Sequence, residues 1–458
     1  MRTTWAIARL TFWEGVRMRI VLVFLILLAF IVLRLPFALR GDETLSGRLQ
    51  TFISYSLGAL SVLMGLATVF FSCATLTNEI HSRTLHLVVS KPVHRFSILA
   101  GKWIGVNLLN VLMIVLAGLV IYGLAAYIKS RPVQFERDRV KLDEVVWTAR
   151  LAADPTPPKL DAAIAERVKA MLEQGRIDES QQEAAAKEVR RDLEQEWVRV
   201  PPGQAREYEF EGLAPPDMRQ DVYQVRFKAR GIPYPIDEML EIGWVILDPK
   251  TGAPMDEFRT HERHGEVHQF LVRSTIVKDG RAVLGVYNPS GPPKPVTIYF
   301  EGDESLQILY RVGNFEPNLA KSMLMILFRL AFLSAVGLFF GTFVSFPVAC
   351  FCVLSVYLFC LGMPWWMEAV QSHLTIAGSQ PKSATIFDPF LRVVKFVMAA
   401  LFPDFQAYDG VGRLIDGIYI PTRVVLASAA HTILYGVALL ALPGWMIFRS
   451  REIAQAAA

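Results

Sequence analysis

Long apolar runs alternate with polar segments along this chain, and the runs have the length of membrane-spanning helices. A bilayer core needs about 20 consecutive apolar residues in a helix. Apolar sequence is almost unbroken from Leu319 to Trp366, which is too long for one crossing. Pro347 disfavours helix at the residue before it and so marks a turn inside this run. The six predicted spans are Ile20–Leu39, Phe52–Leu76, Trp103–Tyr127, two spans divided at Ser345-Phe346-Pro347, and Arg423–Phe448.

The first apolar run follows a basic segment that contains Arg2, Arg9, Arg17 and Arg19, a pattern that secretion signals share. The apolar part is long, however, and no clean small-x-small cleavage site follows it. The pattern therefore favours a retained helix over a cleaved signal peptide.

The distribution of positive charge predicts the orientation of the helices. Basic residues gather in the N-terminal segment, in the 78–102 segment and in the C-terminal tail, and six crossings put all three on one side. The positive-inside rule makes that side the cytoplasm. We therefore expect cytoplasmic termini, with the polar segment 132–318 and the 368–421 connection outside.

The 368–421 connection contains a shorter apolar stretch, Phe390–Phe402. At about 13 residues this stretch cannot span a bilayer. We predict an external re-entrant segment over 389–403, and an amphipathic helix lying on the outer leaflet is an equally open alternative.

The polar segment 132–318 has the character of a folded α+β domain. Residues 160–174 and 179–197 are rich in Ala, Glu, Lys and Arg, as in helices, whereas 206–312 has the β-branched and aromatic runs of strands, separated by turn signals. This pattern predicts a small β-sandwich behind a helical stalk. All four cysteines, Cys73, Cys350, Cys352 and Cys360, lie in apolar spans, so no disulfide framework is expected in the domain.

The predicted fold class is thus an α-helical integral membrane protein with six transmembrane helices and an inserted extracytoplasmic domain. Of the 458 residues 53% are hydrophobic and 20% are charged, and the net charge of +4 is too mild to indicate a nucleic-acid partner. The predicted parts are an interfacial helix 1–19, spans one to three in 20–131, the domain 132–318, spans four to six in 319–448, and a tail 449–458.

Few residues carry recognisable chemistry. The chain has no phosphate-binding loop, nucleophile elbow or kinase signature, so no catalytic residue is assigned. His261, His264 and His268 lie close together in a predicted strand-and-turn region, where they could bind a metal or form a solvated strand edge. Among the ionisable residues inside the spans, Arg329 is expected to snorkel to the interface or to face protein.

The segment between spans two and three is polar and basic. Ile80, Thr84, Leu87 and Val88 recur at helical spacing over 78–90, and Lys91-Pro92 ends that helix. We predict a short amphipathic helix at the cytoplasmic surface. It either fixes topology as a charged loop or docks a cytoplasmic partner.

The segment "NEIHSRTLHLVVSKPVHRFSILAGKWIG" resembles the first cytoplasmic loop of permease subunits of ATP-binding-cassette (ABC) transporters of the type-2 branch. The shared features are Glu79, Thr84-Leu85, Leu87, Ser90-Lys91-Pro92 and Gly101-Lys102. Arg83 stands where the branch usually has glycine, and Val88-Val89 where leucines are common. These departures leave the amphipathic pattern intact.

The N-terminal "WAIARLTFWEGVRMRI" resembles the interfacial elbow helix of the same branch. Its apolar stripe consists of Trp5, Ala8, Phe12, Trp13 and Val16, and its polar companions are Arg9, Glu14 and Arg17.

The resemblance implies a permease of a bacterial inner membrane that couples ATP hydrolysis in a separate cytoplasmic ATPase dimer to export or movement of a substrate. ATP and Mg²⁺ would bind the ATPase, and this chain would bind no cofactor. A second permease protomer, identical or different, would complete the membrane part, and a further protein could bind the extracytoplasmic domain. The residues expected to dock the ATPase are Glu79, Ile80, Arg83, Thr84, Leu87, Val88, Lys91, Pro92 and Arg95.

Two other functions stay open. The chain could be a non-transporting mechanotransmission unit, which passes ATP-driven motion to the extracytoplasmic domain. It could also be a membrane-anchored binding or sensor protein, although this leaves the interfacial helix and the loop after it without a role.

Overall fold

The computed structural model divides the chain into two compact units. One consists of Met1–Ala149 with Gly313–Ala458 and is called the helical unit, and the other is Arg150–Val312, the β-rich unit. The structure describes residues 2–38, 44–81, 94–132, 136–178, 181–213, 222–233, 239–292, 295–300, 305–378 and 387–450.

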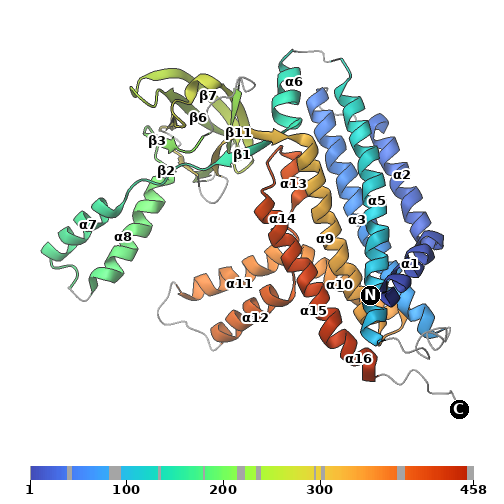
Figure 1. Cartoon of the computed structure of the whole chain (residues 1–458). Coiled ribbons are helices and arrows are strands. Elements are labelled where there is room, and N and C mark those ends of the chain that lie inside the picture. The colour runs from blue at the N-terminus through green and yellow to red at the C-terminus, as the bar shows by residue number, and fades with distance from the viewer. Residues whose placement is uncertain are drawn as a thin grey trace. The chain divides into compact units, whose positions relative to one another are not determined.

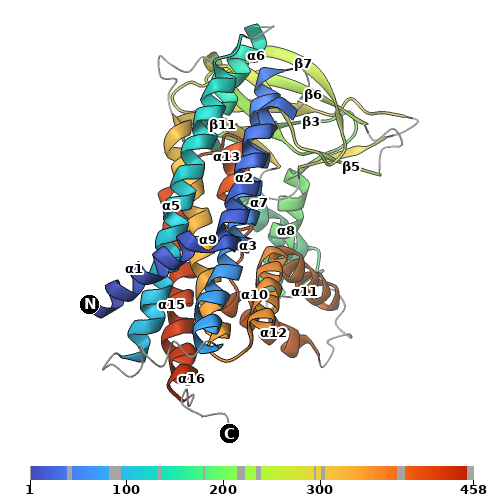
Figure 2. The same ribbon diagram turned by 90° about the vertical axis from the view of Figure 1, so that its right-hand side faces the viewer.

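The first half of the helical unit contains α1 (Arg2–Arg17), α2 (Arg19–Ala38), α3 (Leu45–His81) and α5 (Arg95–Lys129). α1 is bent by 59° from the helix that follows it. α2, α3 and α5 run side by side in both views (Figures 1 and 2). α3 continues without a break through Thr77–His81, so the first residues of the predicted 78–90 helix belong to α3 instead. Residues 82–93, the rest of that predicted helix, lie outside the described residues.

The second half begins with α9 (Phe315–Gly341), α10 (Phe346–Leu361), α11 (Met363–Gly378), α12 (Phe387–Leu401) and α13 (Gly410–Ile415). The last helical run consists of α14 (Thr422–Ala429), α15 (Tyr435–Leu439) and α16 (Trp445–Ser450), joined by π-helical turns Ala430–Leu434 and Leu440–Gly444. Pro347 lies in the first turn of α10, where proline is tolerated because its missing N–H has no helical partner there. The turn between the two spans is therefore 342–345, just before the predicted position.

Within the described residues, four helices are long and apolar enough to cross a membrane, and up to six spans result if each of two bent helix pairs counts as one. The four are α3, α5, α9 and the run 422–449; the pairs are α1 with α2, and α10 with Met363–Val370 of α11, bent by 60°. The prediction of a multi-pass helical membrane protein is confirmed. The amphipathic α12 covers nearly all of the predicted re-entrant segment 389–403.

Small residues let the long helices approach closely. A Cβ atom on Gly337 of α9 would lie 2.0 Å from the Ser72 hydroxyl of α3, so only glycine fits at this contact. Around it, Phe52, Leu57, Leu330 and other buried apolar side chains of α3, α5 and α9 form one continuous core.

Arg329 of α9 faces protein, one of the two alternatives expected from the sequence. Its guanidinium donates to the Ser61 hydroxyl of α3 at 3.2 Å and to the backbone carbonyl of Phe405 at 3.0 Å. It also lies 4.9 Å from the centre of the Phe405 ring. The charge thus ties the segment after α12 to the centre of the helical unit.

A short helical segment after α5, α6 (Glu136–Lys141) with the π-helical turn Leu142–Val146, belongs to the helical unit. Asp138 of α6 caps the N-terminus of α3, because its carboxylate accepts the backbone N–H groups of Leu45 at 2.7 Å and Ser46 at 3.1 Å. Burial of the Asp138 carboxyl opposes ionisation, but the hydrogen bonds from Ser46 and Leu45 outweigh it and lower its pKa below the ordinary value.

Replacing Asp138 with alanine is expected to cost about 1 kcal/mol of unfolding free energy, the usual worth of a helix cap. Because the folded-state pKa is lowered, the carboxylate stabilises the protein above its ordinary pKa of 3.8 and loses this effect as the pH falls through the folded value. Thermal unfolding of D138A and wild type should therefore differ at pH 7 and converge below that pKa. Asp143→Ala, which removes surface ion pairs with Lys129 and Arg139, is the control and should change stability less. A difference that persists at low pH contradicts the capping role.

The β-rich unit contains three sheets and a pair of helices. The sheet orders are β1-β11-β4-β8, β2-β10-β5 and β3-β9-β6-β7. The strands are β1 (Thr148–Ala153), β2 (Arg199–Val200), β3 (Ala205–Phe210), β4 (Val222–Phe227), β5 (Arg230–Ile232), β6 (Met239–Leu247), β7 (Pro254–Arg263), β8 (His268–Arg273), β9 (Ala282–Tyr287), β10 (Thr297–Tyr299) and β11 (Leu306–Asn314). The helices are α7 (Asp161–Glu173) and α8 (Gln182–Trp197).

The predicted strand-rich fold is present, but the predicted helical stalk is wrong. β1 precedes α7 and already pairs with β11, so α7 and α8 form an insertion between β1 and β2. The sheets are also three, around one shared core, instead of the two of a sandwich. The unit is shorter than the predicted 132–318 because α6 packs with the membrane helices and α9 begins at Phe315.

Candidate functional site

Four helices meet near the place where α3 ends at His81 and α5 begins at Arg95. Both ends lie at one end of the helical unit, where α16 also ends (lower end in Figure 1), and α1 crosses α5 nearby (Figure 2). We call this region the loop junction, since the 82–93 connection leaves from it. It contains two sets of polar contacts.

The first set is a buried charge cluster that joins α1, α3 and α5, made of Glu14, Thr75, Glu79 and Lys102. The Lys102 side chain is only 2% exposed, and its Nζ lies 2.8 Å from the Glu79 carboxylate. Nζ also donates to the Thr75 carbonyl at 3.0 Å and the Thr75 hydroxyl at 3.3 Å. The Thr75 hydroxyl in turn donates to the Glu14 carboxylate at 3.0 Å.

These contacts explain how a lysine is tolerated inside the helical unit. A buried ammonium without partners would cost several kcal/mol, so it must be paired and fully hydrogen-bonded. An ammonium has three donors, and here each has an acceptor. The cluster therefore fixes the end of α3 to α5 and, through Thr75, to α1.

Close helix packing brings these side chains together. A Cβ atom on Gly101 of α5 would lie 2.8 Å from Ile7, and one on Gly105 would lie 2.6 Å from the Ala8 carbonyl. Gly15 of α1 is similarly close to Leu109 and Phe71. The glycines at 101 and 105 thus form a small-xxx-small surface on which α1 lies, with Lys102 beside it.

The second set of contacts ties the start of α5 to the last helix. The Arg95 guanidinium donates to the backbone carbonyls of Phe448 at 2.7 Å and Arg449 at 2.8 Å. Both carbonyls belong to the last described turn of α16, and a positive charge is favourable near the C-terminus of a helix. The ring of His94 stacks on Trp445 with centroids 6.1 Å apart. Phe448 itself is buried in an apolar cluster with Leu76 and Leu99.

The loop junction therefore holds both ends of the 82–93 connection. Glu79 binds one end to α5 and α1, and Arg95 binds the other end to α16. A displacement of the connection relative to the bundle would act on all three helices through these contacts. The junction offers mechanical linkage between helices, and its polar groups are already engaged with one another.

The structure describes three of the predicted ATPase-docking residues, and all three make contacts inside the chain. Glu79 and Arg95 bond as above, and Ile80 packs against the apolar cluster that contains Leu76 and Phe448. The other six, Arg83, Thr84, Leu87, Val88, Lys91 and Pro92, lie outside the described residues.

The face of α1 that packs on protein differs from the predicted apolar stripe. Ala8, Thr11 and Gly15 are buried, whereas Trp5 is 59% and Trp13 48% exposed. Arg9 and Arg17 are exposed too, but Glu14 turns toward Thr75. The small residues of α1 contact α5 because they allow the backbones of the two helices to approach closely. The large aromatic side chains face outward.

The three histidines considered as a candidate metal cluster, with a solvated strand edge as the alternative, do not converge. His268 pairs with Glu262 at 2.9 Å, His264 accepts the backbone N–H of Gly231 at 2.8 Å, and His261 is exposed, 3.9 Å from Glu241. Across the described part of the chain, no group of three or more His, Cys, Asp or Glu side chains is arranged to hold a metal ion.

The roles of Lys102 and Thr75 were not predicted from the sequence. Lys102 was recognised there only as a topology charge and a motif residue. The available signal was its position: a lysine directly after the first glycine of a G-x-x-x-G pattern, at the start of an apolar run, lies on or beside the face where another helix packs.

Comparison with known families agrees with this picture. Residues 5–137 match the model of the ABC-2 family transporter proteins, a range that contains most of α1 and all of α2, α3 and α5, the helices of the buried charge cluster among them, but not α16. No curated protein matches the chain. Membrane components of that family are not themselves catalytic, and the family implies a partner ATPase. Over 133 of its 458 residues, the chain is thus similar to the membrane component of ABC-2 family transporters.

Proposed function

We propose that this permease couples ATP hydrolysis by a separate cytoplasmic ATPase dimer to the movement of a substrate across a bacterial inner membrane. ATP and Mg²⁺ are bound by the ATPase. Two permease protomers form the membrane part, with the loop junction on the cytoplasmic side and the β-rich unit on the other side. The direction of movement that the resemblance favours is export.

The observation that carries this proposal is the double attachment of the 82–93 connection. A coupling segment transmits force only if its ends are fixed to the elements that must move. Here Glu79 reaches α5 and α1 through Lys102 and Thr75, and Arg95 reaches α16. A connection joined to the bundle by the backbone alone could move without displacing the helices.

In the proposed cycle, ATP closes the ATPase dimer and shifts the docked connection. The attached helices follow, and the permease populates a second arrangement of its spans. Docking falls to Leu87 and Val88 as apolar anchors, with Arg83, Thr84, Lys91 and Pro92 around them. Glu79, Ile80 and Arg95 act as positioning residues, because their side chains are used within the chain.

A second candidate function is mechanotransmission to the β-rich unit without transport. The observation that favours it is the continuity of β11 with α9: Asn314 ends the strand and Phe315 begins the helix. Because β11 and α9 are consecutive in the chain, a movement of α9 would act through the backbone on β11, which is an inner strand of its sheet.

Co-expression with candidate ABC ATPases, taken first from the neighbouring genes, tests the proposal. We expect wild type to co-purify with the ATPase, and Leu87→Asp/Val88→Asp to lower the bound ATPase by about tenfold or more, since each buried carboxylate costs at least about 1.4 kcal/mol. Membrane insertion should stay normal, because both positions lie in the polar segment between spans.

The matched control makes the same two replacements elsewhere. Val267 and Leu271 of the β-rich unit are 50% and 40% exposed, so Val267→Asp/Leu271→Asp should retain the ATPase. Full retention of a coupled ATPase by Leu87→Asp/Val88→Asp would show that the connection is not the docking element.

A further inference from the structure

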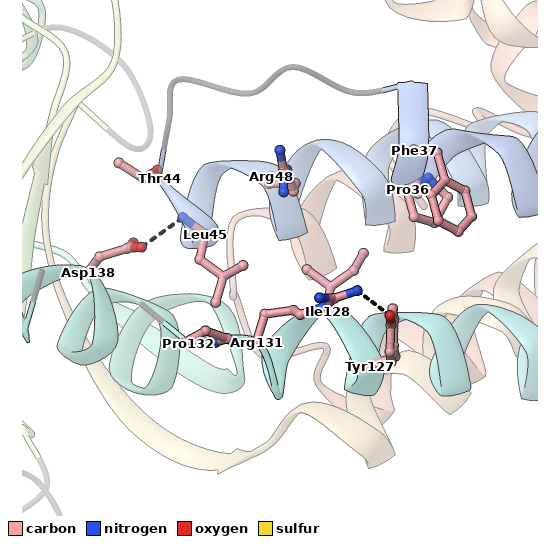
Figure 3. A pocket seen from close by; sticks show the side chains of 10 residues that line it. All are labelled: Pro36, Phe37, Thr44, Leu45, Arg48, Tyr127, Ile128, Arg131, Pro132 and Asp138. Atoms are coloured by element: carbon pink, nitrogen blue, oxygen red, sulfur yellow. Dashed lines mark hydrogen bonds between the residues drawn. The ribbon is translucent and has the colours of Figure 1, made fainter. Parts of the chain in front are cut away.

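A cavity of about 790 Å³ lies at the opposite end of the helical unit from the loop junction. It is formed by the end of α2, the first turn of α3, the end of α5 and α6, and Figure 3 shows its lining side chains. All of these elements belong to the helical unit. We call it the α2–α5 cavity.

The α2–α5 cavity is at the depth where a membrane changes from hydrocarbon to headgroups. Arg48 lies in the first turn of α3, directly before its apolar stretch, and Arg131 follows the last turn of α5. Tyr127 lies one turn further in, and tyrosines are enriched at this depth. Pro36 and Phe37 close the α2 side.

Among the described lining residues of the α2–α5 cavity, positive charge exceeds negative charge, with two arginines and one carboxylate. Arg48 and Arg131 are both exposed, and within the described residues neither has a carboxylate partner. The Arg131 guanidinium is held by a hydrogen bond to the Tyr127 hydroxyl, drawn in Figure 3, and lies 4.8 Å from the centre of its ring. The acidic side chain of the lining, Asp138, accepts the two N–H groups at the start of α3.

Large apolar side chains of α2 lead from the α2–α5 cavity along the helix. Phe37 in the lining is 77% exposed, and one and two turns before it Leu33 and Phe30 are 51% and 62% exposed. Arg34 shares this face of α2 and is exposed too, so a third guanidinium lies beside the path. A ligand that used the whole site would combine an anionic group between the arginines with a long apolar part along α2. An inorganic anion would occupy the space between the arginines and leave the apolar surface of α2 uncovered.

We propose that the α2–α5 cavity binds an acidic phospholipid of the adjoining leaflet. Its phosphate lies between Arg48 and Arg131, and an acyl chain runs along Phe37, Leu33 and Phe30 of α2. The two guanidinium groups select acidic over zwitterionic lipids, because a net negative headgroup is attracted by both. This inference rests on the membrane location of the helices and is independent of the proposed coupling to an ATPase.

Native mass spectrometry of the full chain in mild detergent tests this lipid site. Wild type is expected to bind phosphatidylglycerol more tightly than phosphatidylcholine. Arg48→Gln should weaken phosphatidylglycerol binding about fivefold, and Arg48→Gln/Arg131→Gln about 25-fold, from about 1 kcal/mol per basic residue at a membrane surface. Because the Arg48 guanidinium has no partner among the described residues, the single variant leaves the packing of the protein unchanged.

Two further variants separate charge and position. Arg48→Lys keeps the charge and should bind phosphatidylglycerol within about twofold of wild type, since headgroup attraction at this surface is a charge effect. Arg423→Gln removes an exposed arginine from the start of α14 and should leave binding unchanged.

In these binding measurements three results would overturn the inference, and the phosphate competition below adds a fourth. The three are equal binding of the two lipids by wild type, wild-type binding of phosphatidylglycerol by the double variant, and the same loss in Arg423→Gln. Competition of excess inorganic phosphate with the bound lipid is the last test. If phosphate displaces the lipid completely, the cavity is an anion site and the lipid assignment is wrong. If the lipid stays bound, the apolar path contributes, and Phe37→Ala should then weaken lipid binding.

Discussion

Lys102→Met is expected to lower the unfolding free energy of the helical unit by about 3 kcal/mol, because it removes one partner of a buried ion pair. Methionine matches the length of the lysine stem but leaves the Glu79 and Glu14 carboxylates facing each other without the ammonium. Breaking such pairs typically costs about 3–5 kcal/mol, and the lower value applies here because Glu79 is 23% exposed and keeps some water. The shift in Tm of the full chain in detergent measures the loss.

A second substitution and a surface control make the Lys102 result specific. Glu79→Gln in the Lys102→Met background removes one of the facing charges and should restore part of the stability, so the two changes are non-additive. Lys187→Met breaks an exposed pair with Glu183 on α8 and should change stability by less than about 1 kcal/mol. Equal Tm values for Lys102→Met and wild type would show that the ion pair does not stabilise the loop junction.

Trp244→Ala is expected to lower the unfolding free energy of the β-rich unit by about 3–5 kcal/mol, the usual cost of deleting a buried tryptophan. The Trp244 ring lies at the centre of the aromatic core, with centroids 4.7 Å from Phe227 and 5.0 Å from Phe270. Its Nε1 donates to the Thr260 hydroxyl at 2.9 Å. Limited proteolysis of the full chain should show cleavage within 150–312 under conditions where wild type is resistant.

The same variant separates the two candidate functions. If the β-rich unit is only an accessory to transport, Trp244→Ala should keep the bound ATPase and transport. If ATP-driven motion is instead passed to the β-rich unit, the ATPase should stay bound while the activity of the β-rich unit is lost. Trp244→Phe keeps most of the ring contacts and should lose about 1–2 kcal/mol. Proteolysis of Trp244→Ala that matches wild type would mean that the core tolerates the cavity.

Hydropathy alone was enough to find the membrane helices, but a span predicted from it can be shorter than the helix at both ends. The predicted span Phe52–Leu76 lies inside α3, which runs from Leu45 to His81. The additional turns carry Ser, Arg, Gln, Thr, Asn and Glu, which a hydropathy criterion assigns to loops. These polar turns extend beyond the apolar part of the helix and hold Glu79 and Arg48.

The packing faces could not be read from hydrophobicity. On α1 the pattern selects Trp5, Phe12 and Trp13 as the apolar stripe, yet in a membrane both lipid and protein are apolar surroundings. Side-chain size decides which face meets protein, and Ala8 and Gly15 are the small residues there. The ion pair of Lys102 could not be predicted from the sequence for another reason. Its partners Glu79 and Thr75 lie on α3, and the chain order does not encode how closely that helix approaches α5.

The β-rich unit shows a similar limit. Strand content was evident from β-branched and aromatic runs, but the pairing of β1 with β11 joins residues that are far apart in the chain. When that pairing is not known, the helical residues 160–197 are predicted to be a stalk that precedes the strands. Sheet order depends on such distant pairings, which local propensity does not determine.

The 60° bend after α10 has a consequence for the surrounding lipid. With 16 residues, α10 rises about 24 Å before it ends, whereas the hydrocarbon layer of a bilayer is about 30 Å thick. Trp365 and Trp366, directly after the bend, are 79% and 50% exposed, and tryptophans of this kind sit at the headgroup boundary. If these tryptophans mark the headgroup boundary, the hydrocarbon layer beside α10 is thinner than usual by about 6 Å. Such hydrophobic mismatch makes the local membrane thickness a variable that acts on the protein.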